Sequence, residues 1–253
     1  MNVIACYKIV PEEQDIMVKS DRTLDTSKAE LKLGQYDLPA IEAAVNAVQE
    51  SGGKVSLLSA GGKEIDNSKL IKGALSRGPD DLYLIIDPAI KEADANQTAA
   101  VLAAAARKIG FDLIICGEGS SDIYAMQVGA QLGEQLGVNV FNAVKNIKPQ
   151  NGAIVIERSL EQEIEVLEAP LPAVISVTTD INLPRIPQLK EILAAGKKPV
   201  TKWGLSELGV TVANPVEVVS TLAPECKERK QIILEGDSDD IIDSFLQNIR
   251  KEL

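Results

Sequence analysis

The chain has 253 residues, of which 45% are hydrophobic and 25% are charged, and its formal net charge is −11. It contains no histidine, which excludes Ser-His-Asp and Cys-His catalysis and histidine-ligated metal sites. The acidic balance argues against a nucleic-acid surface, because phosphate binding needs basic patches. We therefore expect a globular protein with no catalytic residue of its own, no metal site and no nucleic-acid partner.

The chain shows neither a membrane span nor a secretory signal. No apolar run approaches the roughly 20 residues that a membrane helix needs. The first residues are strand-like, with no basic segment ahead of an apolar one. The three cysteines, Cys6, Cys116 and Cys226, lie far apart in sequence, as is usual in a reducing compartment. These features predict a cytoplasmic protein that does not insert into membranes.

Short apolar runs alternate with helical patterns over residues 1–140. The expected strands cover residues 3–7, 55–59, 82–86 and 113–116, and the expected helices cover residues 37–50, 67–77, 96–109 and 124–136. Uniformly apolar strands separated by helices are typical of a parallel sheet covered on both faces. We predict a doubly wound α/β fold, in which ligands bind beyond the carboxyl ends of the strands where the chain order reverses.

The pattern changes after residue 140. Residues 153–158 and 163–168 alternate with a period of two, which predicts a small antiparallel hairpin. A strand at 173–177, a short helix at 188–195, a possible strand at 232–234 and an amphipathic helix at 238–251 follow. Residues 197–230 have no strong periodicity. We therefore expect an α/β domain over residues 1–200 and a C-terminal arm with a helix over residues 201–253, which either wraps a partner or folds back on its own domain.

The loop after the fourth expected strand is the clearest candidate for ligand binding. Gly117 and Gly119 would let backbone N–H groups approach an anion, and a helix start would add unpaired N–H groups. Ser120 and Ser121 offer hydroxyl donors, and Asp122 offers a helix cap or an acceptor for a ribose hydroxyl. A plain strand-to-helix turn explains the same residues, because their spacing matches neither a Walker loop nor GxGxxG.

Two other features carry weaker signals of function. Cys6 and Ala60 end neighbouring strands at the same expected edge of the sheet, where they could line an adenine or ribose crevice or simply begin turns. The proline-punctuated segment 182–198 holds Leu189 on a polar background. Leu189 is therefore either the anchor of a docking loop or a residue that faces its own core.

The hairpin and the strand after it resemble the signature of electron-transfer flavoprotein β subunits. The matching residues are Arg158, Glu161, Glu163, Glu165 and Leu167, followed by Leu171-Pro172-Ala173-Val174-Ile175. The opening segment 5–11, Asn182-Leu183-Pro184-Arg185 and Lys197-Lys198 match in the same register. The resemblance covers about residues 1–210 and is closest to the Fix-type branch, which is linked to carnitine or acyl-CoA metabolism.

The resemblance implies a heterodimer with a larger α subunit that holds the redox-active FAD. The pair would carry electrons between a dehydrogenase and a downstream, for instance quinone-linked, acceptor. It also implies that this subunit binds AMP, or in bifurcating members a second FAD, at its strand ends. The implied cofactor residues are Cys6, Gly34, Ala60, Gly117, Glu118, Gly119, Ser120, Ser121, Asp122, Gln127 and Gly129, and the implied partner-docking residues are Arg185, Leu189 and Ile192.

One stretch departs from the family pattern. After Asp122 the family commonly has a small or acidic residue and then Thr or Cys, whereas this chain has Ile123-Tyr124-Ala125-Met126. AMP, FAD and an emptier site therefore stay open. Two other functions stay open as well: a structural partner subunit with a vestigial nucleotide pocket, and an adenylating enzyme of the adenine nucleotide α-hydrolase type. The second would want a phosphate loop near residue 10, for which the segment 9–13 is unsuited.

Overall fold

The computed structural model describes residues 1–213, 216–225 and 230–251. The chain divides into two compact units, one of residues 1–17 and 25–220 and the other of residues 18–24 and 221–253. Parts of the predicted arm, including Cys226, lie outside the described residues. Each unit is considered by itself.

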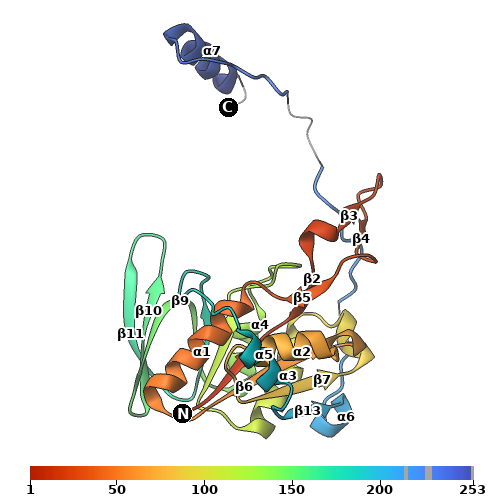
Figure 1. Ribbon diagram of the computed structural model, residues 1–253, viewed down its shortest axis with the longest axis vertical. Helices are drawn as coiled ribbons and strands as arrows, with labels where there is room; N and C mark the ends of the chain where they lie inside the picture. Colours follow the sequence, from red (N-terminus) through yellow and green to blue (C-terminus); the bar gives the residue numbers. More distant parts are fainter. Residues whose placement is uncertain (214–215, 226–229, 252–253) are drawn as a thin grey trace. The chain divides into compact units, whose positions relative to one another are not determined.

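The first unit is built on a nine-stranded sheet with the order β11-β10-β9-β12-β8-β1-β6-β7-β13 (Figure 1). The strands are β1 (Asn2–Cys6), β6 (Lys54–Gly61), β7 (Asp81–Ile86), β8 (Leu113–Gly117), β9 (Asn139–Gln150), β10 (Ala153–Ser159), β11 (Ile164–Pro170), β12 (Ala173–Val177) and β13 (Val200–Trp203). All neighbours from β9 to β13 in this order are parallel, while β9, β10 and β11 pair antiparallel as a hairpin extension. The predicted α/β fold with its antiparallel hairpin is confirmed.

Helices cover both faces of this sheet. One face carries α1 (Asp37–Ser51), α2 (Ser68–Leu75) and α5 (Leu189–Ala195), and the other carries α3 (Ala95–Ile109), α4 (Val128–Leu136) and α6 (Leu205–Leu208). Side-chain caps fix two of the starts: Asn67 accepts from the N–H groups of Lys69 and Leu70 at α2, and Asp94 accepts from the N–H of Gln97 at α3. The remaining elements of the unit are short.

These short elements are the strands β2 (Ile9–Pro11) and β5 (Leu31–Leu33), which pair antiparallel, and the 3₁₀ turns η1 (Glu13–Asp15), η2 (Lys63–Ile65) and η3 (Pro88–Glu92). Strands β3 (Met17–Val18) and β4 (Leu24–Asp25) each have one residue in the first unit and one in the second.

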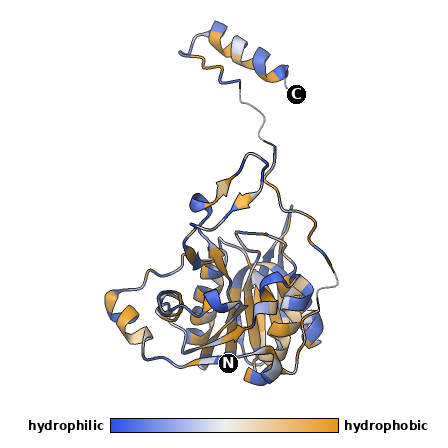
Figure 2. Ribbon diagram, turned by 90° about the vertical axis from the view of Figure 1, so that its right-hand side faces the viewer, coloured by the Kyte–Doolittle hydropathy of each residue, from blue (hydrophilic) through white to orange (hydrophobic). Residues whose placement is uncertain are grey.

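The central strands are apolar on both faces because each face meets a layer of helices. In β8, Leu113 and Ile115 belong to the core beneath α1, and Ile114 and Cys116 belong to the core beneath α3 and α4. Figure 2 shows the hydrophobic colour running along the strands of the sheet. This two-sided burial produces the uninterrupted apolar runs from which the strands were predicted.

The chain order reverses between β1 and β8. From β1 the chain proceeds to β6 and β7 on one side, and α3 then brings it back to β8 on the other side of β1. The loops that leave β1 and β8 therefore diverge, and the carboxyl ends of these two strands flank the point where ligands bind in folds of this kind.

Three sequence-based expectations were wrong in detail. The helix expected over residues 124–136 begins only at Val128, because Tyr124 (φ 51°) and Met126 (φ 55°) adopt left-handed conformations that no helix continues. The expected irregular arm contains β13 and α6, so the predicted boundary at residue 200 falls within a strand of the main sheet. Residues 232–234 form no strand, and the long strand β9 was not predicted.

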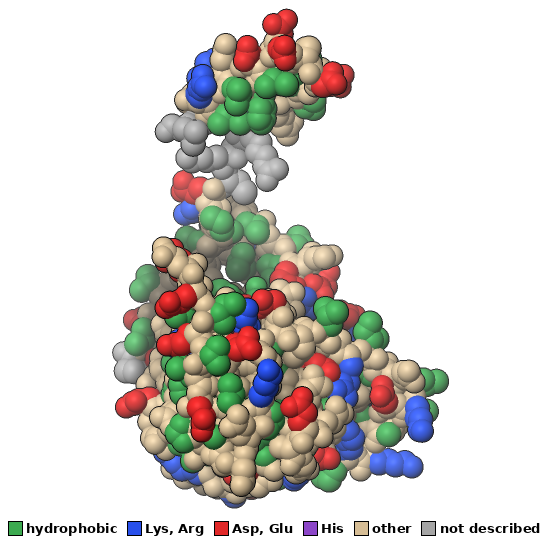
Figure 3. Space-filling view, turned by 90° about the vertical axis from the view of Figure 1, so that its left-hand side faces the viewer, with side chains coloured by type: hydrophobic (Ala, Val, Ile, Leu, Met, Phe, Trp, Pro, Cys, Tyr) green, Lys and Arg blue, Asp and Glu red, His purple; other side chains and the backbone are tan. Residues whose placement is uncertain are grey.

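The second unit contains the amphipathic helix α7 (Asp239–Arg250), close to the predicted 238–251. Its apolar residues Ile242, Phe245, Leu246 and Ile249 recur at helical spacing and stay exposed. Figure 3 shows hydrophobic side chains gathered on one side of this helix. Across the described part of the chain, no helix combines the length and apolar character needed to span a bilayer.

The close approach of α4 to the sheet depends on a glycine. A Cβ at Gly133 would lie 2.1 Å from Cγ2 of Val140 and 3.3 Å from Cβ of Val174. We expect Gly133→Ala to lower the free energy of unfolding by about 1–3 kcal/mol, because the helix must move off the strands. Gly73→Ala in α2 is the matched control, since its Cβ would meet only Leu33 at 3.6 Å. The control should leave stability unchanged or raise it by up to about 1 kcal/mol, and equal losses in both would contradict the packing argument. Denaturant titration measures both.

Candidate functional site

Two buried cysteines end the strands that flank the reversal. Cys6 ends β1, and Cys116 lies next to the end of β8 on the neighbouring strand. A hydrogen bond to Cys116 and burial raise the pKa of Cys6 well above its usual value. A protonated, buried thiol is a poor nucleophile, so Cys6 is unsuited to covalent chemistry.

The turn before α1 lies between the end of β1 and the end of β8. The N–H of Lys8 donates to Asp37 Oδ2 over 2.8 Å, and the N–H of Gly34 donates to Lys8 O over 2.9 Å. A Cβ at Gly34 would lie 2.5 Å from Asp37 Oδ2, and one at Gly117 would lie 2.5 Å from the Tyr36 carbonyl oxygen. Both predicted glycines are therefore required at this edge, and the group they make room for is the Asp37 turn of the same chain.

The carboxyl group of Asp37 is buried beside the loop after β8. Burial raises its pKa to about 7, since the N–H bond and the charge of Lys8 only partly offset the loss of solvent and the charge of Asp122 adds to the rise. Burial and the same carboxylate also raise the pKa of Tyr7. The edge of the sheet thus holds an acid that titrates near neutral pH.

A salt bridge connects the two strand ends. Lys8 Nζ lies 2.5 Å from Asp122 Oδ2, and the side chain of Asp122 is 23% exposed. Partial burial alone would raise the pKa of Asp122, but hydrogen bonds from Lys8 and Ser120 outweigh it, and the pKa is lowered. Asp122 Oδ1 also accepts from the N–H of Ile123 over 2.9 Å. Asp122 is thus tied to β1 and does not cap α4.

Tyr124 packs back onto its own loop. A Cβ at Gly119 would lie 2.6 Å from the Tyr124 ring, whose centroid is 5.0 Å from that of Tyr36. The N–H of Tyr124 donates to Ser120 O over 3.0 Å, and Glu118 hydrogen-bonds the phenol. Gly119 therefore accommodates a tyrosine ring, which differs from the predicted close approach to a ligand phosphate.

Residues before and after Tyr124 carry polar groups that lack a hydrogen-bond partner or a cap among the described residues. Ser121 Oγ is buried and has no hydrogen-bond partner among the described residues. Gln127, the N-cap of α4, makes no side-chain capping bond, so its side chain leaves the first N–H groups of that helix without a cap. At Gly129 a Cβ would lie 2.3 Å from Ser176 Oγ, which reflects close packing of α4 on β12. An unpaired hydroxyl and an uncapped helix start suit an anionic group such as a nucleotide phosphate.

The structure brings most of the predicted cofactor residues to one edge. Cys6 and Gly34 lie at the β1 end and residues 117–122 at the β8 end, while Ala60 lies near the end of β6, which pairs with β1. Three residues of this edge, Lys8, Tyr36 and Asp37, were not predicted. Lys8 was detectable in principle, as the first charged residue after the strand that flanks the reversal.

The predicted docking segment is anchored to α1 by Arg185. Its guanidinium donates to both carboxylate oxygens of Glu42, over 2.7 Å from Nε and 2.9 Å from Nη2. Asn182 Nδ2 donates to Pro39 O over 3.0 Å, and Arg77 Nη1 donates to Arg185 O over 2.8 Å. Arg185 is therefore occupied within the chain and holds the segment in place.

The apolar residues of that segment face solvent. Leu183 is 93% exposed, Ile186 is 91% exposed and Leu189 is 72% exposed, and Ile192 and Leu193 are also exposed. We call these five residues the apolar loop surface. Of the two alternatives for Leu189, the one in which it faces its own core is wrong, because the side chain projects from the start of α5 into solvent. Five exposed large apolar side chains within one segment of 11 residues are typical of interaction sites.

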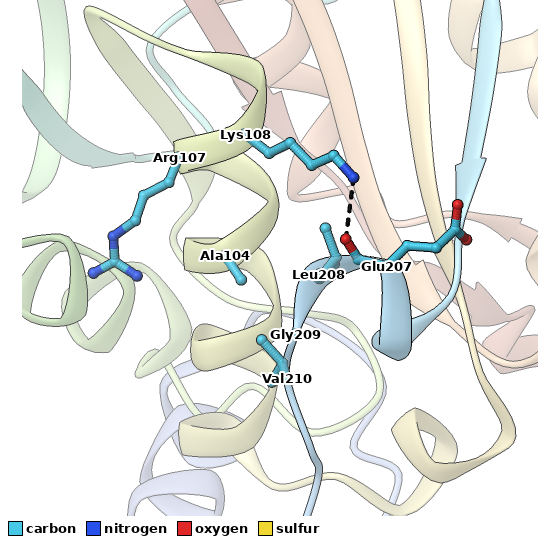
Figure 4. A pocket seen from close by; sticks show the side chains of 7 residues that line it. All are labelled: Ala104, Arg107, Lys108, Glu207, Leu208, Gly209 and Val210. Carbon is cyan, nitrogen blue, oxygen red and sulfur yellow. Dashed lines mark hydrogen bonds between the residues drawn. The ribbon is translucent and has the colours of Figure 1, made fainter.

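A shallow hollow lies between α3 and α6 (Figure 4). Its two cations already have partners. Lys108 Nζ donates to Glu207 O over 3.1 Å and lies 4.5 Å from the centre of the Trp203 ring, and Arg107 donates to Gln135 O. The hollow thus offers no free charge for an anion, and we place the candidate site at the β1 and β8 ends.

Most of the first unit matches the model of a known protein family. The model described as the electron transfer flavoprotein domain matches residues 21–208. The matched range includes Asp37, the loop after β8 and the apolar loop surface. It therefore spans most of the first unit, the apolar loop surface and the β8 side of the candidate site, while Cys6 and Lys8 at the end of β1 lie before the matched range.

The raised pKa of Asp37 predicts a pH-dependent stability. Its folded value, about 7, lies above the ordinary value of 3.8, so the folded chain binds the extra proton and stability falls as pH rises from about 4 to 7. Asp37→Asn resembles the protonated acid and should raise the melting temperature relative to wild type at pH 8 but not at pH 4. Asp66→Asn, at an exposed ion pair with Lys202, is the control and should show no such difference between the two pH values. A constant offset for Asp37→Asn would contradict burial of an ionised carboxylate.

Proposed function

The chain belongs to the electron transfer flavoprotein domain family, and from this premise we propose that it is the β-type subunit of a two-subunit electron-transfer flavoprotein. The observation that carries the proposal is the edge at β1 and β8, where Lys8, Ser121 and the start of α4 gather at the reversal of a chain of this family. Members of the family carry electrons with flavin. The protein groups bind and orient the cofactor, which supplies the redox chemistry itself.

We propose that this edge holds AMP or a second FAD, while the larger subunit holds the redox-active FAD. Ser121 Oγ and the first N–H groups of α4 would hold a phosphate, and the edge from Cys6 to Ala60 would receive the nucleoside. The absence of histidine agrees with this role, since an electron carrier need not activate a nucleophile. A Fix-type role in cytoplasmic carnitine or acyl-CoA metabolism, with or without electron bifurcation, belongs to the same proposal.

We further propose that the apolar loop surface docks the dehydrogenase or quinone-linked partner, and that the C-terminal arm with α7 packs on the larger subunit. The exposed apolar side of α7 supports the second contact, because such a helix needs a covering surface. A structural subunit with a vestigial pocket is the second candidate. It is favoured by Tyr124, which fills the space beside Gly119 that a phosphate would otherwise approach.

Extraction of nucleotide separates these two candidates. The complex, co-expressed with its larger subunit, is denatured and the released nucleotides are quantified by chromatography. We expect AMP, or FAD beyond that of the larger subunit, at about one per chain, and about tenfold weaker retention in Ser121→Ala, since a charge-assisted hydrogen bond is lost. Ser206→Ala in α6 is the control. A complex that carries electrons without this nucleotide would support the vestigial pocket.

The docking role of the apolar loop surface is tested by Leu189→Ala. Removing this exposed anchor should weaken binding of the electron-transfer partner about tenfold, as for a residue at the centre of an interface, with flavin absorbance unchanged. Stopped-flow measurement of electron transfer against partner concentration gives the change. Val166→Ala, an exposed apolar residue on β11, is the control. Identical kinetics in Leu189→Ala and wild type would rule out the docking role.

A further inference from the structure

Lys8 interacts with two carboxylates, Asp37 through its backbone N–H and Asp122 through its ammonium group. Its N–H donates to Asp37 Oδ2 over 2.8 Å, while its Nζ is 2.5 Å from Asp122 on the other side of the reversal. The side chain of Lys8 is 43% exposed, so its ammonium group is reachable from solvent. Asp37, in contrast, is buried and forms no salt bridge with any residue that the structure describes.

The charges around Asp37 come from both strand ends. Lys8 and Tyr7 face it from the end of β1, Cys6 lies beside them, and Asp122 faces it from the loop after β8. A second negative charge at this edge would raise the free energy of ionised Asp37, because like charges repel strongly where solvent is excluded. An anionic ligand can therefore be accommodated best if Asp37 is neutral.

We propose, on the basis of the function proposed above, that the ammonium group of Lys8 leaves Asp122 and pairs with the phosphate of the bound nucleotide. When this phosphate binds, Asp37 takes up a proton from solvent. Lys8 then compensates the ligand charge, and Asp122 becomes free to accept a hydrogen bond from the sugar hydroxyls. Lys8 and Asp37 become part of the nucleotide site, and occupancy of that site becomes dependent on pH.

The direction of this pH dependence follows from comparing the pKa of Asp37 in the free protein with its pKa in the nucleotide complex. In the free protein the pKa of Asp37 is about 7, and the added phosphate raises it further. The complex therefore holds the proton more tightly than the free protein does. Affinity is highest below pH 7 and falls as pH rises through 7 toward the higher value in the complex.

The test uses the co-expressed complex, stripped of nucleotide, with AMP and adenosine as probes in isothermal titration calorimetry. Lys8→Met should weaken AMP binding about 10- to 100-fold while adenosine changes less than about twofold, because only AMP carries the phosphate. Lys8→Arg should retain most of the AMP affinity. Lys69→Met, in an exposed ion pair with Glu30, is the matched control and should bind both probes like wild type.

Proton uptake is read from the same titrations in PIPES and in Tris at pH 7, whose ionisation enthalpies differ. AMP should bring more proton uptake in wild type than in Asp37→Asn, and this difference cancels the ionisation of AMP itself. AMP binding that Lys8→Met leaves intact, or equal losses for both probes, would overturn the inference while leaving the nucleotide site standing. Failure of wild type to bind either probe would overturn the proposed nucleotide role and this inference with it.

Discussion

The parallel pairing of β1 with β8 determines where the functional groups of the first unit can lie. This pairing joins segments more than 100 residues apart and places their carboxyl ends side by side, with the chain departing in opposite directions from each. The space between the departing loops is then filled by the Asp37 turn, which requires glycine at positions 34 and 117. The Lys8–Asp122 salt bridge depends on the same register, because each partner follows one of the two strands.

Helix α1 supports both candidate functional regions. Its first residue, Asp37, lies at the strand ends, and Glu42, just over one turn further on, binds Arg185 of the docking segment. Burial of the α1 face against the sheet fixes the direction of the helix and with it both carboxylates. The two candidate regions thus share one rigid element.

The sequence allowed the strands of the parallel core to be predicted because burial on both faces leaves uninterrupted apolar runs. It did not reveal β13, because an edge strand of four residues derives its conformation from pairing with β7. The start of α4 was also missed, since the left-handed conformation of Tyr124 comes with its packing on Gly119 and Tyr36. At the site, Gly34 and Gly117 lie at the strand ends, where the space beside them is taken by the Asp37 turn, a contact that the sequence did not indicate. A salt bridge between residues 114 positions apart cannot be read from local pattern.

The bidentate contact between Arg185 and Glu42 fixes the backbone of the apolar loop surface before any partner binds in the proposed docking role. Leu183 and Ile186, on either side of Arg185, stay almost fully exposed while the backbone between them is held to α1. The conformational entropy of this segment is therefore lost during folding and need not be lost again on association. In the docking role proposed above, a preorganised apolar patch of small area favours fast, reversible encounters over long-lived complexes, which is the kinetic behaviour that an electron carrier between successive partners requires.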